Sequence, residues 1–256
     1  ETIRQESQFD YTHKKQTGGS GQFGQVIGVL KPLANENKDT EDQVFKFHNE
    51  IKGGNIPSEF IGACEKGFGD VMDKGPLAAF PMINCEVFLK DGRYHDVDSS
   101  DMAFRIASRQ AMKQAIGKAD PVLLEPSMNV EVTTPDEFQG SVIGDLSSRR
   151  GLIRGSETDP AGEVIINSQV PLAEMFGYSS DLRSMSSGKA SYTMEFSEYT
   201  ECPSSVQQEV IKKRAEKLSS DEESFLQKRH PFINQFSKAF PFRGEAFCSV
   251  TLKRKS

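Results

Sequence analysis

The sequence predicts an α+β protein of two domains, followed by a helix and a tail. Its 256 residues are enough for two domains that each bury a core. Alternating apolar and polar residues, typical of strands, occur between amphipathic stretches of helical period. Asp120-Pro121 interrupts one such helical stretch, because a residue before proline disfavours helix. We expect domains at 1–121 and 122–200, a C-terminal helix at 201–218 and a tail of unknown structure at 219–256.

The first domain combines strands with two helices. Strands are expected at 25–33, at 44–51 and around 83–89, where apolar residues alternate with more polar ones. The first helix is expected to begin at Pro57, since proline suits the first helical position, and to end near Gly75. The second helix is expected directly after three capping residues, Asp98, Ser99 and Ser100. Its inward face is rich in alanine.

The second domain repeats a strand–helix–strand order. A strand at 128–132 is followed by Thr134-Pro135-Asp136-Glu137, which we interpret as a capping box that starts a helix ending at Gly151. Strands at 152–154 and 164–170, a helix that includes residues 175–185, and a strand at 191–199 complete the set. The order βαββαβ is that of a ferredoxin-like, split βαβ domain. After Pro203, apolar residues at helical spacing predict the C-terminal helix.

Composition excludes several classes of protein. No run of 18 apolar residues occurs and no signal peptide is visible, so we expect no membrane span. The net charge is −6, yet residues 201–256 carry 11 Lys and Arg against 7 Asp and Glu. An RNA partner would therefore be met by local basic spots. The four cysteines are scattered, which favours buried thiols in a reducing compartment over disulfides or a zinc site. The chain begins at Glu1 in a strand-like run, so we expect a piece of a longer protein.

A glycine-dense segment at 18–26 contains the pattern G-x-G-x-x-G-x-V. A Rossmann turn would need a helix directly after it, whereas residues 26–30 are strand-like. A kinase loop would need the H-R-D-x-x-x-x-N and D-F-G motifs, and the sequence has neither. A structural hairpin loop or a flexible tip that approaches a partner closely remains. We therefore expect no bound nucleotide, cofactor or metal, and no catalytic residue, in this chain.

Two further segments carry candidate functional residues. His95 lies in a loop with three carboxylates, which could indicate a metal site or an acid–base pair. The neighbours of His95 are explained as turn and cap residues, so it is either a surface histidine or a chemically active residue. Arg149 and Arg150 end a predicted helix. They either satisfy the negative end of the helix dipole or grip a phosphate.

Many ordered segments resemble translation elongation factor G. His13–Gly24, Gly53–Pro57, Lys74–Leu77 and Tyr94–Ser100 resemble its domain IV. Leu124–Pro126, Gly144–Gly151, Pro171–Tyr178 and Asp181–Ser184 resemble its domain V. The resemblance covers residues 1 to about 217, and residues 13–33 are closest to mitochondrial factors and their bacterial relatives.

The resemblance implies a ribosomal protein S5 domain 2-like fold for the first domain, against which the C-terminal helix would pack. It also implies a function: domain IV mimics tRNA and enters the A site of the small ribosomal subunit during GTP-dependent translocation of tRNA and mRNA. The tip that contacts rRNA, tRNA and mRNA would comprise Gln16, Gly18, Gly19, Ser20, Gly21, Gln22, Tyr94, His95 and Asp96. Candidate contacts to large-subunit rRNA are Arg149 and Arg150.

The parent would be a GTPase, with GTP and magnesium in a G domain absent from this chain. We expect a monomer, in the bacterial cytoplasm or the mitochondrial matrix. Alternatives are the same domains in a ribosome-recycling or ribosome-protection GTPase, a free-standing ribosome-binding regulator, or a nucleotide-binding enzyme that uses Gly19–Gly24.

Overall fold

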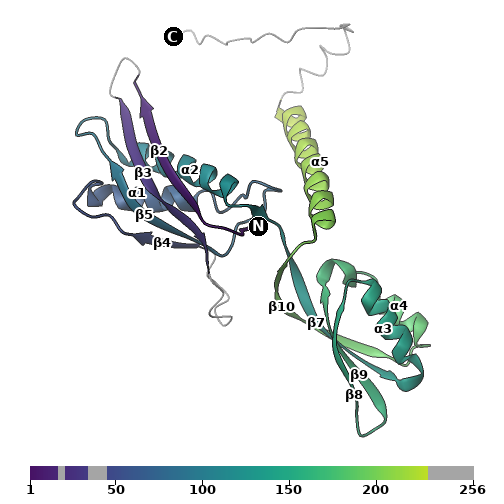
Figure 1. The fold of residues 1–256 in the computed structure, drawn as a ribbon. Helices are drawn as coiled ribbons and strands as arrows, with labels where there is room; N and C mark the ends of the chain where they lie inside the picture. Colours follow the sequence, from purple (N-terminus) through teal and green to yellow (C-terminus); the bar gives the residue numbers. More distant parts are fainter. Residues whose placement is uncertain (17–20, 34–44, 230–256) are drawn as a thin grey trace, which may run out of the picture. The chain divides into compact units, whose positions relative to one another are not determined.

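The computed structural model describes residues 1–16, 21–33 and 45–229 (Figure 1). Within these ranges the chain forms two α+β domains and a C-terminal helix, which confirms the predicted fold class. Of the predicted site residues, Gly18, Gly19 and Ser20 lie outside the described ranges, as does the loop predicted at 34–43.

The first domain is a four-stranded sheet with two helices. The sheet order is β2-β3-β5-β4, with β4 parallel to β5 and the other neighbours antiparallel. This arrangement fits the expected S5 domain 2-like fold. The strands are β2 (Ser7–Lys15), β3 (Gln22–Pro32), β4 (Phe45–Asn49) and β5 (Cys85–Arg93), and the helices are α1 (Ser58–Gly69) and α2 (Asp101–Lys118).

The helices and one face of the sheet enclose the first core. The alternation predicted for β5 is present, since Cys85, Val87 and Leu89 are fully buried. Alanines on α2 are also buried in this core. At the crossing, a Cβ added to Gly67 of α1 would lie 2.5 Å from the carbonyl oxygen of Arg105 in α2. The close packing therefore requires glycine at that position.

The predicted ends of these helices need correction. Ser100 is the N-cap of α2, and its side chain accepts a hydrogen bond from the Ala103 amide, as predicted. Pro57, however, is the extended residue before α1 and not its first helical residue. Helix α1 ends at Gly69 and not near Gly75, because hydrogen bonds beyond Gly69 tighten to a separation of three residues and form turns.

The second domain has the predicted ferredoxin-like topology. Its antiparallel sheet has the order β10-β7-β9-β8, which places the first and third strands in the centre. Helices α3 and α4 cover a core that includes Val130, Val132 and Tyr178. The elements are β7 (Leu124–Pro135), α3 (Gln139–Ser148), β8 (Leu152–Thr158), β9 (Glu163–Pro171), α4 (Tyr178–Met185) and β10 (Ser191–Glu201).

The capping box predicted at Thr134–Glu137 is wrong. Strand β7 continues through Pro135, and Thr134 is buried opposite Val164 of β9. A 3₁₀ turn at Asp136–Phe138 then precedes α3, without a side-chain cap. Pairing between the strands keeps these residues extended and overrides the local capping signal.

A short strand pairing and a long helix complete the described residues. Strand β1 (Thr2–Ile3) pairs with β6 (Pro121–Val122). Helix α5 spans Ser204–Arg229, so it continues beyond the predicted end at residue 218. Its packing against the first domain stays a prediction. None of the helices in the described ranges is long and apolar enough to cross a membrane.

Candidate nucleic-acid interface

The candidate site consists of two segments at one end of the first sheet, which we call the paired loops. The first is Gly21 with the first two residues of β3, Gln22 and Phe23, and the second is residues 94–99. The register pairs Lys15 of β2 with Gln22 of β3, and Gln25 with Arg93 of β5, so both loops leave the same end of the sheet. The described parts of the two segments that the resemblance assigns to the tip therefore lie at the same end of the sheet, and their role as a contact surface stays a prediction.

Hydrogen bonds join the paired loops at three points within the described ranges. The Phe23 amide donates to the Asp98 carbonyl oxygen at 2.8 Å, and the Gly21 amide donates to the Asp98 carboxylate at 3.1 Å. The Ser99 hydroxyl donates to the carbonyl oxygen of Phe23 at 2.9 Å. A side chain at position 21 would meet the Asp98 carboxylate, since an added Cβ would lie 2.8 Å from it. The two loops therefore form one hydrogen-bonded unit.

His95 is exposed at the surface of this unit, and its backbone is fixed. The His95 amide donates to Ser99 Oγ at 2.8 Å, and the Ser99 amide donates back to the His95 carbonyl oxygen at 3.0 Å. The imidazole Nδ1 accepts hydrogen bonds from the amides of Val97 and Asp98, both at 3.2 Å. The Phe23 ring lies 6.3 Å from the imidazole. The loop thus presents a defined imidazole face to the solvent.

The remaining predicted contact residues lie around His95 or on the other loop. Tyr94 and Asp96 are exposed beside His95, and Gln16 is exposed at the end of β2. Gln22 is half-buried and its amide oxygen Oε1 lies 2.9 Å from His13 Nε2, from which it accepts a hydrogen bond when that nitrogen is protonated. The structure therefore brings together all the predicted tip residues that it describes.

Two lysines give this end of the sheet local positive charge. Lys14 and Lys15 are exposed on β2, and neither has an ion-pair partner among the described residues. Free ammonium groups beside polar loops are suited to phosphate contacts, which position nucleic acid without reading its sequence. The positive charge is thus local to the end of β2, while the whole chain carries a net charge of −6.

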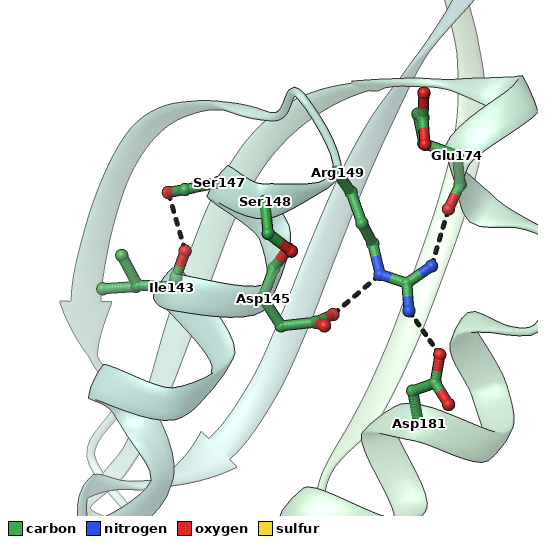
Figure 2. Close-up of polar contacts among 7 residues, drawn as sticks. All are labelled: Ile143, Asp145, Ser147, Ser148, Arg149, Glu174 and Asp181. Carbon is green, nitrogen blue, oxygen red and sulfur yellow. Dashed lines mark hydrogen bonds and ion pairs between the residues drawn. The ribbon is translucent and has the colours of Figure 1, made fainter.

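Arg149, a candidate RNA contact, is held inside the second domain (Figure 2). Its guanidinium bonds Asp145 at 2.8 Å, the Glu174 carbonyl oxygen at 2.7 Å, and Asp181. Only 14% of the side chain is exposed, and the guanidinium lies over the ring of Tyr178, 5.1 Å from its centroid. Burial disfavours its charge, but the bonds to Asp145 and Asp181 outweigh this and raise the pKa of Arg149.

Arg150 is also engaged within the domain. It has a positive φ of 63° and pairs with Glu125, whose side chain is only 9% exposed, and with Glu174 at 3.4 Å. The bond to Glu125 is the largest of the influences that raise the pKa of Arg150. Both arginines thus connect the end of α3 to neighbouring parts of the second domain through hydrogen bonds and ion pairs. RNA contact by them stays a prediction.

Reactive thiols, a metal site and a nucleotide-binding turn were also considered from the sequence, and the described residues give little support for them. Cys64, Cys85 and Cys202 are free and buried, and burial raises the pKa of the Cys64 thiol to about 11 and of Cys85 to about 12. Such thiols are poor nucleophiles and metal ligands. No cluster of three metal-ligating side chains occurs among the described residues. The glycine-dense loop leads into strand β3, which is not the helix that a Rossmann turn requires.

Comparison with known proteins matches the two domains separately. The family description "Elongation factor G, domain IV" matches residues 1–120, and "Elongation factor G C-terminus" matches residues 122–210. The chain is 48% identical over 222 residues to elongation factor G 2 of Bdellovibrio bacteriovorus, and 50% identical over 220 residues to elongation factor G 1 of Syntrophus aciditrophicus. These alignments cover 87% and 86% of the chain but only 31% and 30% of the relatives.

A solved structure agrees with this assignment. The crystal structure of a Thermus thermophilus protein superposes with a TM-score of 0.71 and 39% sequence identity. The match covers 84% of this chain and 31% of that protein. The chain thus spans about a third of the length of the proteins it resembles, and it belongs to the elongation factor G family, of which it contains domain IV and the C-terminal domain.

Proposed function

We propose that this chain is the ribosome-binding C-terminal region of an elongation factor G that promotes GTP-dependent translocation of tRNA and mRNA. The first domain enters the A site of the small ribosomal subunit with the paired loops foremost, and the second faces large-subunit rRNA. GTP and magnesium bind in the G domain of the longer protein, which this chain does not contain. The curated relatives are bacterial, which favours the bacterial cytoplasm over the mitochondrial matrix as the site of action.

The observation that carries the proposal is the hydrogen-bonded pairing of the two loops. A flexible loop would lose conformational entropy on entering an RNA groove, and that loss weakens binding. Here Asp98 and Ser99 already join the loops, so the backbone that carries the exposed residues Tyr94, His95 and Asp96 is held in place before binding. Lys14 and Lys15 add contacts for nearby phosphates.

The proposed mechanism is steric and electrostatic. The paired loops occupy RNA space that the moving tRNA vacates, and they stabilise the displaced state against return. A contact that favours this state by about 1–3 kcal/mol shifts the equilibrium by roughly 5- to 150-fold. No bond is made or broken by the chain itself.

The test is His95→Ala in a full-length factor that carries this chain as its C-terminal part. We expect translocation, followed by stopped-flow fluorescence of labelled mRNA, to slow by roughly 5- to 150-fold. Ribosome-stimulated GTP hydrolysis should stay near wild type, because His95 lies in domain IV. Lys113→Ala, at an exposed position of α2, is the matched control and should change neither rate. Parallel loss of hydrolysis, or unchanged translocation, would contradict the proposal.

Nucleotide binding is the alternative from another class, and a direct measurement separates it. Titration of the isolated chain with fluorescent GTP and ATP analogues should give no saturable binding. Micromolar affinity would instead favour a nucleotide-binding enzyme that uses residues 19–24.

A further inference from the structure

The hydrogen bonds around the His95 ring determine which of its nitrogens carries the proton. Two backbone amides, those of Val97 and Asp98, point at Nδ1 at 3.2 Å. A backbone N–H can only donate, so Nδ1 must be an unprotonated acceptor. A neutral imidazole with an unprotonated Nδ1 carries its hydrogen on Nε2.

The environment of Nε2 differs from that of Nδ1. The His95 side chain is 56% exposed, and Nε2 makes no hydrogen bond to any residue in the described ranges. The carboxylate of Asp98 faces the other nitrogen, since its Oδ2 lies 3.8 Å from Nδ1. The Phe23 ring, 6.3 Å away, is the aromatic neighbour from the other loop. With respect to the described residues, the Nε2–H group is therefore a free donor at the surface of the paired loops.

The acceptor role of Nδ1 depends on the turn that aims the two amides at it. Ser99 holds this turn, because its Oγ accepts from the His95 amide and donates to the Phe23 carbonyl oxygen. Asp98 also holds this turn, because its carbonyl oxygen accepts from the Phe23 amide and its carboxylate accepts from the Gly21 amide. Neither side chain needs to touch a partner in order to set the proton position on His95.

We propose that His95 acts as a fixed hydrogen-bond donor through Nε2–H toward an acceptor atom of RNA, and that Ser99 and Asp98 are the positioning residues that fix this tautomer. The tautomer follows from the contacts within the chain, whereas the identity of the acceptor rests on the proposed function. A donor at this position selects phosphate oxygens, ribose hydroxyls or the acceptor edges of bases over donor groups.

The tautomer can be measured on this chain without a ribosome. Long-range ¹H–¹⁵N correlation spectra of the ¹⁵N-histidine-labelled chain distinguish a protonated from an unprotonated ring nitrogen, and His95→Ala assigns the signals. At about pH 8.5, above the ordinary histidine pKa near 6.5, we expect His95 to show a single tautomer with the proton on Nε2. Ser99→Ala should convert this pattern into an average of both tautomers. A proton on Nδ1, or averaging already in the wild type, would overturn the proposal.

The donor role is tested in the full-length factor by two amide substitutions. His95→Gln places amide hydrogens near the position of Nε2, whereas His95→Asn keeps an acceptor near the position of Nδ1 and provides no donor farther out. We expect His95→Gln to translocate within about 5-fold of wild type, because it keeps the donor. His95→Asn lacks the donor and should be as slow as His95→Ala. Equal rates for the Gln and Asn variants would overturn the donor role.

These results separate the two proposals. If the spectra show Nε2–H and the Gln and Asn variants are equally slow, the donor role is wrong while the proposed function stands. If the Ala, Gln and Asn variants all translocate like wild type, both the proposed function of this tip and the donor role are wrong. This conclusion would hold for either tautomer of His95.

Discussion

Replacement of Arg149 by alanine should destabilise the second domain by about 2–4 kcal/mol. Two of its bonds, to Asp145 at 2.8 Å and to the Glu174 carbonyl oxygen at 2.7 Å, are charge-assisted and partly buried. Each such bond contributes about 1.5–3 kcal/mol, and water that enters the vacated space recovers part of the loss. The pair with Asp181 adds little, because that carboxylate is 56% exposed and exposed pairs contribute about 0.2–1 kcal/mol.

Hydrogen exchange measured by mass spectrometry reports on this domain separately from the first. Each 1.4 kcal/mol corresponds to a factor of ten, so amides of β9 and α4 should exchange roughly 30- to 700-fold faster in Arg149→Ala. Arg149→Lys should fall between alanine and wild type, because an ammonium cannot span three acceptors as the planar guanidinium does. Arg183→Ala, at an exposed position of α4, is the matched control. If Arg149→Ala exchanged like this control, the guanidinium would not hold the domain together.

Three further changes test the packing and the ionisation of the first domain. Gly67→Ala should lower its stability in urea by about 1–3 kcal/mol through overpacking, because the added Cβ would lie 2.5 Å from the Arg105 carbonyl oxygen. Gly62→Ala on the same helix has open space and should raise stability by about 0.5–1 kcal/mol; equal effects would contradict the packing. The pKa of Cys85 is raised to about 12, so above its ordinary value of 9.0 the unfolded chain releases a proton that the folded chain keeps. Stability should therefore fall as pH rises above 9, and less steeply in Cys85→Ala; identical slopes would refute this. The hydrogen bond from Arg105 lowers the pKa of Asp70, so its stabilisation is present above the ordinary value of 3.8 and is lost as pH falls through the folded-state pKa. Asp70→Asn should thus lower the urea midpoint at pH 7 and progressively less below pH 4, and a loss independent of pH would contradict this.

The fold was predictable where periodicity and topology agreed. The alternation at 83–89 and the βαββαβ order both appear in the structure, since each reflects many residues acting together. Single-residue signals were less reliable. Thr134–Glu137 has the composition of a capping box, but the pairing of β7 with β9 holds Thr134 and Pro135 in a strand. Local capping is worth about 1 kcal/mol, so a ladder that extends over the whole strand prevails.

The partners of the two arginines could not be predicted for a related reason. Asp145 is four residues before Arg149 and could have been recognised as a helical ion pair. Asp181 and Glu125, by contrast, are distant in sequence, and only the fold brings them to the end of α3. Without these partners, two adjacent arginines look like a free phosphate site. The structure shows that most of their hydrogen-bonding capacity is already used.

The interpretation of Asp98 as a helix cap is wrong, and it concealed a longer-range role. The sequence accounted for Asp98, Ser99 and Ser100 together as helix caps, which left His95 as the one unexplained side chain. In the structure, Ser100 alone caps α2, while Asp98 and Ser99 reach across to Gly21 and Phe23. A single helix needs only one N-cap side chain, so the surplus of capping residues was itself a signal that some of them bond elsewhere. The position of His95 therefore depends on residues that sequence reasoning had assigned to the helix.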